Sequence, residues 1–545
     1  MKTKNANSIH QNQTAEWSFT SSKAYKDPFN EVELSVRFTL ENGAEQLVPA
    51  FWAGGKNWRV RFASPLTGKY HFLTVCTDPS DSGLHGQAGD FQVKRYTGSN
   101  PLFCHGPIRV AADKRYFEHA DGTPFFWLGD TWWMGLCKRL TWPKGFQTLT
   151  RDRVKKGFSV IQIVAGLYPD MPAFDQRGAN EAGFPWEQDY RRINPAYFDR
   201  ADRRIRHLVK SGLAPCIVGC WGYFLPWMGI EKMKKHWQNL VARFGSYPVI
   251  WCLAGEGTMP YYLSTNKEAD AQFQKKGWTE LATYVRKIDP YRHPITIHPS
   301  SSARLCVEDP SVLDFDMLQT GHGFPSALPN TVQRVQESYQ RKPVMPVVEG
   351  EVLYEGIGAV DSSQAQRWLF WACILNGVAG YTYGANGIWQ VNTRARPYGP
   401  SPHGMSWGDT PWEDAFQLPG SRQLGLARRF LERYHWWQLE PHPEWVEPGW
   451  TKALFDLPFT CGRHDVPLAA GIPGKFRLIY IPMGTGLKVV KGIEQDVRYR
   501  VRLFNPVTGA ERDIGAVKPD AQGNWGYGKI RMPIYQDWLL ILEAK

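Results

Sequence analysis

The segment PVIWCLAGE, residues 248–256, decides the fold class of this chain. It is apolar without interruption from Val249 to Ala254, and it then ends at the carboxylate of Glu256. A run of this kind is typical of a strand buried on both faces, as in a parallel sheet covered by helices. The preceding run, LAPCIVGC at residues 213–220, has the same character. These two segments therefore predict neighbouring strands of a parallel α/β fold.

Apolar runs separated by helix-like segments extend from residue 124 to residue 389. The predicted strands are PFFWLGD (124–130), FSVIQIVAG (158–166), LAPCIVGC (213–220), PVIWCLAGE (248–256), HPITIHP (293–299), LDFDMLQTGH (313–322), PVMPVVEGE (343–351) and AGYTYGANGIW (379–389). One intervening helix is marked at both ends, with Asn194 as N-cap, Pro195 in the first turn and Gly212 at the end. Eight such units predict a (β/α)8 TIM barrel. A doubly wound open sheet is the alternative, but no glycine-rich dinucleotide-binding turn follows the first strand.

The sequence on both sides of the barrel predicts β-structure. Short alternating runs between turn residues indicate a sandwich before the barrel. Short β runs return near the C-terminus, where KFRLIYIP and LKVVKGI, joined across Gly484-Thr485-Gly486, predict a hairpin. We therefore expect an N-terminal β-sandwich at 15–97, a catalytic (β/α)8 barrel at 98–440 and a small C-terminal β-domain at 441–545.

Composition and charge narrow the class of function. Aromatic residues make up 14% of the chain, with 24 Trp, and flat aromatic surfaces are common platforms for sugar rings. The net charge of +12 favours an acidic partner such as nucleic acid, anionic lipid or acidic polysaccharide. However, the basic residues are scattered, and no zinc-finger spacing, P-loop or basic arm accompanies them, so we do not expect nucleic acid binding.

Three further expectations concern the membrane, the compartment and cofactors. No stretch reaches the ~18 apolar residues that span a bilayer, so we expect no membrane insertion. The N-terminus lacks the apolar middle of a signal peptide, which predicts a cytoplasmic protein, or a secreted or periplasmic one if a leader was trimmed. The nine Cys show no metal-binding spacing. We expect neither a metal nor a cofactor.

Active sites of such barrels lie at the carboxyl ends of the strands, which gives a short inventory of candidate residues. We expect substrate contacts from Asp130, Trp132, Trp133, Gln162, Tyr168, Trp221, His298, His322, Glu349, Tyr354, Tyr383, Asn386 and Trp389. Trp132 and Trp133 are adjacent, so at most one of them should face the cleft. For Asp130, capping of the first loop is the alternative, and for the two histidines the alternative is a structural role.

Carboxylates end the fourth and seventh strands, which is the arrangement that glycoside hydrolysis needs. The apolar surroundings of Glu256 should raise its pKa toward that of a proton donor, although a surface pair with an arginine is the alternative. Glu349 and Glu351 have the same strand parity and could point the same way. The spacing does not choose which of them reacts.

Four motifs carry a resemblance to a known family. They are FFWLGDTWW (125–133), PVIWCLAGE (248–256), GEVLYEG (350–356) and RWLFWACILNGVAGYTYGANGIWQ (367–390). The chain resembles the apiosidase-like glycoside hydrolases, glycoside hydrolase family 140 and its relatives, over nearly its whole length. The resemblance implies a retaining barrel enzyme with a leading β-sandwich and a small trailing β-domain.

The resemblance also assigns roles to the two strand ends. It places Glu256 at the acid/base position and Glu351 at the nucleophile position. Two departures stand out: Ala254-Gly255-Glu256 replaces the family's usual Gly-Gly-Asp, and Val352 stands where a proline commonly follows the nucleophile. Because a longer acid reaches further, the substrate and its linkage could differ from apiosides.

The sequence therefore predicts a retaining glycoside hydrolase acting on a plant or algal polysaccharide or its oligosaccharides. An acidic glycan would suit the positive charge, with the loop at 167–193 presenting Arg177, Arg191 and Arg192. The alternative is that these arginines pair with acidic residues of the same loop, Glu181, Glu187 and Asp189. The rival functions are a glycosidase of neutral glycans and a non-catalytic carbohydrate- or matrix-binding protein.

Overall fold

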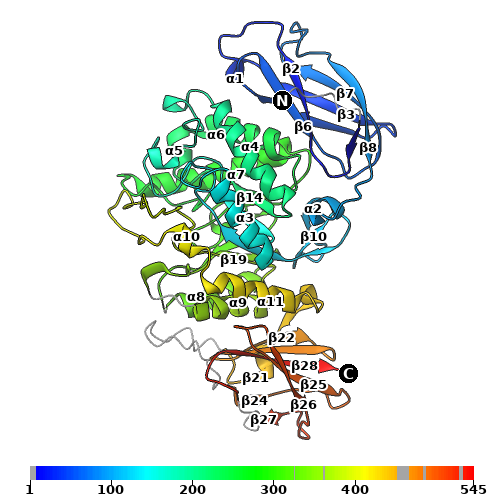
Figure 1. The fold of residues 1–545 in the computed structure, drawn as a ribbon. Coiled ribbons are helices and arrows are strands. Elements are labelled where there is room, and N and C mark those ends of the chain that lie inside the picture. Colours follow the sequence, from blue (N-terminus) through cyan, green and yellow to red (C-terminus); the bar gives the residue numbers. More distant parts are fainter. Residues whose placement is uncertain (1–7, 325, 360–362, 451–465, 483–486, 527–531) are drawn as a thin grey trace.

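The computed structural model describes residues 8–324, 326–359, 363–450, 466–482, 487–526 and 532–545. The chain forms three parts in a row, with N-terminal sheets at one end, a barrel in the middle and C-terminal sheets at the other end (Figure 1). Within the described ranges, no helix is both long and apolar enough to cross a membrane.

Eight parallel strands form the central sheet, and each lies within one of the predicted runs except that β12 extends one residue beyond its run. They are β12 (Trp127–Thr131), β13 (Val160–Val164), β14 (Ala214–Val218), β15 (Ile250–Cys252), β16 (Ile295–Thr296), β17 (Asp316–Gln319), β18 (Val347–Glu351) and β19 (Gly380–Tyr383). Their order is β16-β15-β14-β13-β12-β19-β18-β17. The predicted (β/α)8 barrel is confirmed.

The barrel closes between β16 and β17 by isolated hydrogen bonds rather than by a strand ladder. The hydroxyl of Thr296 donates to the carbonyl of Phe315 at 3.0 Å. The amide of Asp314 donates to the carbonyl of Ile295 at 2.8 Å. These bonds satisfy the polar groups that an open sheet edge would leave unpaired.

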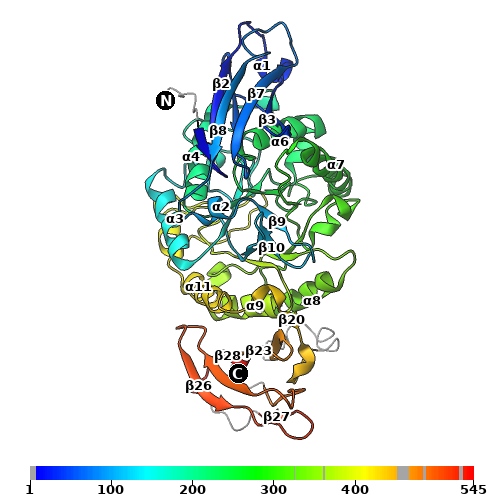
Figure 2. The ribbon, with the colours of Figure 1, turned by 90° about the vertical axis from the view of Figure 1, so that its right-hand side faces the viewer.

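Helices surround the sheet (Figure 2). The main ones are α3 (Lys144–Lys156), α4 (Pro195–Lys210), α6 (Ile230–Phe244), α7 (Lys267–Ile288), α8 (Ala327–Gln340), α9 (Ser363–Leu375) and α11 (Pro419–Leu431). Short helices are α1 (Pro28–Glu31), α2 (Pro101–Cys104), α5 (Phe224–Met228) and α10 (Trp412–Ala415). In α4 the side chain of Asn194 accepts from the amide of Ala196, as expected of an N-cap, and Gly212 follows with a φ of 81°.

The N-terminal part consists of two sheets packed face to face. One has the order β1-β8-β7-β3-β4 and the other β2-β6-β5. Their strands are β1 (Ser8–His10), β2 (Ala15–Thr20), β3 (Leu34–Leu40), β4 (Glu45–Pro49), β5 (Phe51–Trp52), β6 (Asn57–Phe62), β7 (Gly68–Cys76) and β8 (Ala88–Lys94). Between the sheets Trp17 packs against Phe91, with ring centroids 4.9 Å apart.

A small sheet of β9 (Ile108–Val110), β10 (Phe117–His119) and β11 (Pro124–Phe125) connects this part to the barrel. Phe117 packs on Trp127 and Phe315, which lie at or just before the starts of their strands. The small sheet therefore covers the amino-terminal end of the barrel and leaves the opposite end for the site.

The C-terminal part has two sheets, β20-β22-β23-β28-β25-β26 and β21-β24-β27. The strands are β20 (Glu440–Pro441), β21 (Val446–Glu447), β22 (Leu468–Ile472), β23 (Phe476–Ile481), β24 (Val489–Val490), β25 (Tyr499–Phe504), β26 (Glu511–Ala516), β27 (Trp525–Gly526) and β28 (Trp538–Ala544). The predicted hairpin is wrong, because β23 and β24 belong to different sheets. Its turn at 484–486 lies outside the described residues.

Candidate active site

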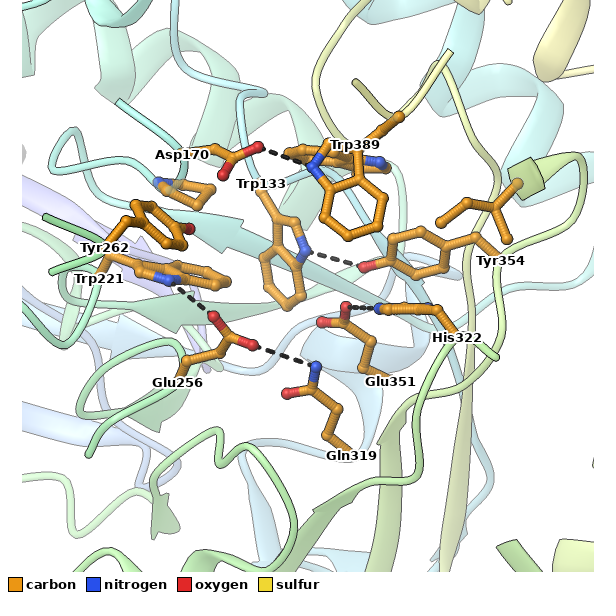
Figure 3. Close-up of a pocket in the computed structure, with 13 residues that line it drawn as sticks. Trp133, Asp170, Trp221, Glu256, Tyr262, Gln319, His322, Glu351, Tyr354 and Trp389 are labelled. Atoms are coloured by element: carbon orange, nitrogen blue, oxygen red, sulfur yellow. Dashed lines mark hydrogen bonds and ion pairs between the residues drawn. The ribbon is translucent and has the colours of Figure 1, made fainter. Parts of the chain in front are cut away.

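A cavity lies at the carboxyl ends of the barrel strands, and Figure 3 shows its lining. It encloses about 480 Å³, its open mouth included. The lining residues are Trp133, Pro169, Asp170, Trp221, Glu256, Tyr262, Gln319, His322, Glu351, Tyr354, Ile357, Trp389 and Trp407. They come from distant segments that the barrel brings together at one end.

Glu256 follows β15 and has a φ of 44°, a left-handed conformation that is strained for a residue with a side chain. Its carboxyl group accepts from Nε1 of Trp221 and from Nε2 of Gln319, both at 3.2 Å. Burial raises the pKa of Glu256, and the negative charge of Glu351 raises it further. Among the described residues, no lysine or arginine forms an ion pair with Glu256. The geometry is that of a proton donor rather than of a surface ion pair.

Glu351 ends β18, and its carboxylate is held between two imidazoles. Nε2 of His322 lies 2.8 Å from one oxygen, and Nε2 of His298 lies 3.1 Å from the other. Burial alone would raise the pKa of Glu351, but the two histidines lower it to about 2. Glu351 is therefore a carboxylate at neutral pH, as a nucleophile must be.

His298 connects the two glutamates. The backbone amide of Glu256 donates to Nδ1 of His298 at 3.4 Å. A neutral imidazole that accepts at Nδ1 carries its proton on Nε2, the nitrogen that faces Glu351. His298, at the end of the fifth strand, therefore orients the carboxylate of Glu351 at the end of the seventh strand.

The structure separates Glu349 from Glu351, contrary to the shared parity that we expected. The ladder between β17 and β18 shifts at this point: Leu318 pairs with Glu349, and Gln319 pairs with Glu351. One residue is thus inserted at Gly350, and such a bulge reverses which face the next side chain occupies. Glu349 is fully buried outside the cavity, and burial raises its pKa well above the ordinary range. It lies in the barrel wall, where burial favours its neutral form.

Aromatic rings form much of the cavity wall. Trp133 lies in the cavity, whereas the adjacent Trp132 packs on Phe146 of α3 with ring centroids 5.6 Å apart. Nε1 of Trp133 donates to the hydroxyl of Tyr354 at 2.9 Å. Trp389 also lines the cavity, and its buried Nε1 has no hydrogen-bond partner within the described chain.

Several residues that we expected to contact substrate do not line the cavity. They are Asp130, Trp132, Gln162, Tyr168, His298, Glu349, Tyr383 and Asn386. Asp130 is corrected to a structural role: it is fully buried, and it accepts from Nε of Arg153 at 2.6 Å and from Nε1 of Trp132 at 2.7 Å. This ion pair fixes the turn that points Trp133 into the cavity.

Other members of that set form hydrogen bonds inside the protein. Gln162 donates to the carbonyl of Gly350 at 2.7 Å across the barrel interior. The Tyr168 hydroxyl pairs with Tyr197 at 2.7 Å, Tyr383 donates to Glu355 at 2.5 Å, and Asn386 donates to the carbonyl of Trp407 at 2.6 Å. These groups support the walls of the site and do not line the cavity, contrary to the expected contacts with substrate.

Among the lining residues that are absent from the strand-end inventory, three with polar or aromatic side chains lie far along the loops. Asp170 belongs to the loop after β13, Tyr262 to the loop after β15, and Trp407 to the loop after β19. No local pattern marks them, since only tertiary contacts bring these loops together. The one signal was the richness of the loops in Trp and Tyr.

The sequence profile described as "Apiosidase-like, catalytic domain" matches residues 111–438, more than half of the chain. The chain belongs to the apiosidase-like family. It is a glycoside hydrolase. Residues 8–77 of this apiosidase-like chain match a domain of unknown function, DUF5060.

Solved structures share the fold of this apiosidase-like protein. A crystal structure of a glycoside hydrolase of family 5 from Bacteroides vulgatus has 20% identity and a TM-score of 0.63, covering 82% of this chain and 95% of its own. Another crystal structure from Bacteroides vulgatus is described as a glycoside hydrolase on tentative grounds. It has 16% identity and a TM-score of 0.69, and the match covers 99% of this chain and 100% of its own. Comparison with curated proteins finds no match.

Proposed function

We propose that this protein is a retaining glycoside hydrolase in which Glu351 is the nucleophile and Glu256 the acid/base. The observation that carries the proposal is the opposite effect of the site on two carboxyl groups that line one cavity. The pKa of Glu256 is raised by burial, whereas the two histidines lower that of Glu351 to about 2. Double displacement requires an acid whose neutral form is favoured beside an ionised carboxylate.

The proposed reaction begins with a sugar bound in the cavity. Glu351 attacks the anomeric carbon while Glu256 donates its proton to the departing oxygen, which gives a glycosyl ester on Glu351. Ester formation removes the negative charge of Glu351, one of the causes that raise the pKa of Glu256. The pKa of Glu256 therefore falls in the intermediate. Glu256 can then take a proton from water, which hydrolyses the ester.

The substrate class that we propose is an O-glycoside within a plant or algal polysaccharide or its oligosaccharides. The loop at 167–193 does not support an acidic glycan. Arg177 pairs with Asp175 at 2.8 Å, and Arg192 pairs with Glu187 at 2.8 Å. The pairing with Glu187 is the alternative that the sequence left open.

The test is hydrolysis of a panel of neutral and acidic glycans by the purified protein and three variants. We expect E256Q and E351Q each to lower kcat by roughly a thousandfold or more, because each role needs an ionisable group. E349Q is the matched control and should keep activity within about tenfold, because Glu349 is outside the cavity. Inactive E349Q beside active E351Q would refute the assignment on β18.

A further inference from the structure

The cavity has a second polar end, which the two glutamates do not account for. Figure 3 shows Asp170 on one side of the cavity and Glu256 and Glu351 on the other, with Trp133 between them. Asp170 lies in the loop that follows β13, and its side chain reaches the cavity from above the strand ends. It is only 4% exposed.

The carboxylate of Asp170 is held in place by the loop that follows β19. Its Oδ2 accepts from the hydroxyl of Ser401 at 3.0 Å and from Nε1 of Trp407 at 2.9 Å. Its backbone has a φ of 61°, again in the left-handed region. Fixed side chains on strained backbone are typical of positions shaped for function.

Asp170 differs from the buried acids Asp130 and Asp202 in its partners. Asp130 has Arg153, and Asp202 has Arg61 and Arg243. Across the described ranges, no lysine, arginine or histidine forms an ion pair with Asp170. Ser401 and Trp407 donate to Oδ2, the hydroxyl of Tyr262 interacts with the same carboxyl group, and a carboxylate can accept about four hydrogen bonds in all. Acceptor capacity therefore remains at the cavity.

The charge of the lining limits what can bind there. Asp170, Glu256 and Glu351 are acidic, and no lysine or arginine lines the cavity in the part of the chain that the structure describes. A carboxylate or sulfate on the bound sugar would meet the like charges of Asp170 and Glu351, with no lysine or arginine in the described lining to compensate. A neutral sugar instead offers hydroxyl donors to Asp170 and ring faces to Trp133, Trp389 and Trp407.

We propose that Asp170 accepts hydrogen bonds from hydroxyl groups of a neutral sugar and sets the specificity of the cavity for neutral over acidic sugars. This inference rests on the proposed function, because it names the substrate class of the same site. Asp170 is assigned to binding and not to bond cleavage. Its removal should therefore act on recognition of particular hydroxyls.

The first experiment compares D170N with wild type on the best neutral substrate of the panel, its monodeoxy analogues and the matching uronide. For the parent substrate we expect D170N to lower kcat/KM by roughly 10- to 100-fold, as for a lost hydrogen bond to a charged group. For the analogue that lacks the recognised hydroxyl, D170N should cause no further loss. D189N is the control, since Asp189 is an exposed acid of the same loop, and thermal unfolding should match wild type.

The second experiment measures binding without turnover, by calorimetry on E351Q and on the double variant E351Q/D170N. The double variant should bind the parent at least tenfold more weakly and the deoxy analogue equally well. Equal losses of affinity for every analogue, or a preference of the wild-type protein for the uronide, would overturn the inference. If E351Q still turned over while the binding loss at Asp170 held, the proposed nucleophile would fail and the inference would stand.

Discussion

At the scale of single residues, the site assigns different protonation states to two residues of the same type. Within the described ranges, Glu256 accepts side-chain hydrogen bonds from an indole and an amide, whereas Glu351 has two imidazoles. The first environment favours the neutral acid and the second favours the anion. The histidines are therefore positioning residues, which act through the carboxylate of Glu351.

Removal of one histidine should move the acidic limb of the pH profile. Glu351 must be ionised to attack, and its pKa of about 2 keeps it ionised throughout the mildly acidic range. Without the hydrogen bond from His322 that pKa rises toward 4.5, so activity is lost at a higher pH as the pH falls. We expect kcat/KM of H322F to fall between pH 5 and 3 by at least ~10-fold more than that of wild type.

The alkaline limb of the pH profile, which reports the pKa of Glu256, should lie at the same pH in H322F as in wild type. H71Q is the control, because His71 lies exposed on the N-terminal sandwich, paired with Asp90. Identical acidic limbs for H322F and wild type would show that His322 does not set the pKa of Glu351.

At the scale of the element, strands were predictable and the directions of their last side chains were not. Continuous apolar runs identify the barrel strands because both faces of each are buried. Strand-end position alone does not separate Trp133, in the cavity, from Trp132, against α3. Glu349 and Glu351 differ because of a bulge that depends on pairing with β17. The place of Asp170 in the cavity was not predictable, because it depends on contacts between two loops more than 200 residues apart.

The end of β12 gives a prediction about stability. Arg153 and Asp130 are both fully buried, so R153M leaves an uncompensated buried carboxylate. We expect R153M to lower the free energy of unfolding by about 3–5 kcal/mol, measured in urea. The double variant R153M/D130N should recover a large part of this loss, since it removes the stranded charge. A double variant less stable than R153M would show that the two residues do not act as a pair.

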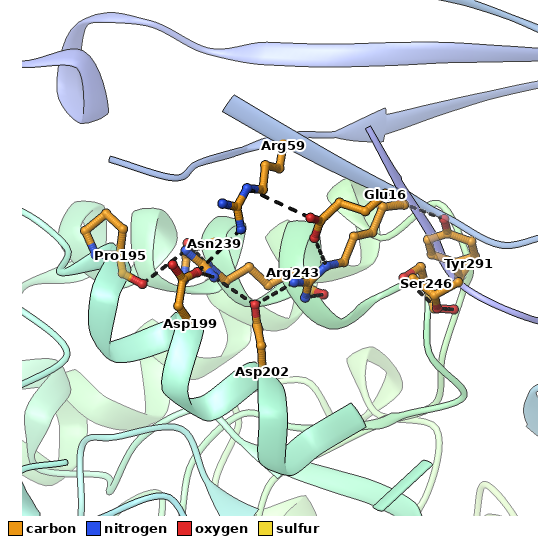
Figure 4. A network of polar contacts seen from close by, with 11 residues as sticks. Glu16, Arg59, Pro195, Asp199, Asp202, Asn239, Arg243, Ser246 and Tyr291 are labelled. Atoms are coloured by element: carbon orange, nitrogen blue, oxygen red, sulfur yellow. Dashed lines mark hydrogen bonds and ion pairs between the residues drawn. The ribbon is translucent and has the colours of Figure 1, made fainter. Parts of the chain in front are cut away.

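At the scale of the whole molecule, buried ion pairs join the barrel to the domains on both sides. Figure 4 shows the contact of the N-terminal sandwich with α4 and α6. Arg61 of β6 binds Glu16 at 2.8 Å and Asp202 of α4 at 2.5 Å, and Arg243 of α6 lies 3.1 Å from Asp202.

On the other side of the barrel, Arg367 of α9 makes a two-pronged pair with Asp537, which precedes β28. Its two hydrogen bonds measure 2.8 and 2.6 Å. Planar pairing of this kind fixes orientation as well as distance. The three parts should therefore behave as one body around the site.

Loss of Arg61 should release the N-terminal sandwich before the barrel unfolds. In R61M the buried charge of Asp202 loses a partner. We therefore expect this variant to have a lower midpoint of thermal unfolding. We also expect the segment between the sandwich and the barrel, residues 95–107, to become sensitive to protease. R59M is the matched control: Arg59 is one-third exposed and 3.9 Å from Glu16, so its loss should cost at most ~1 kcal/mol. Equal protease sensitivity of R61M and R59M would contradict a clamp at Arg61.

The configuration of the first product tests the central claim most directly. Proton NMR during early turnover of a substrate of known anomeric configuration records the sugar before it mutarotates. Double displacement through an ester on Glu351 inverts the anomeric carbon twice, so we predict a first product with the configuration of the substrate. A first product of the opposite configuration would contradict the account and make one glutamate a base that activates water.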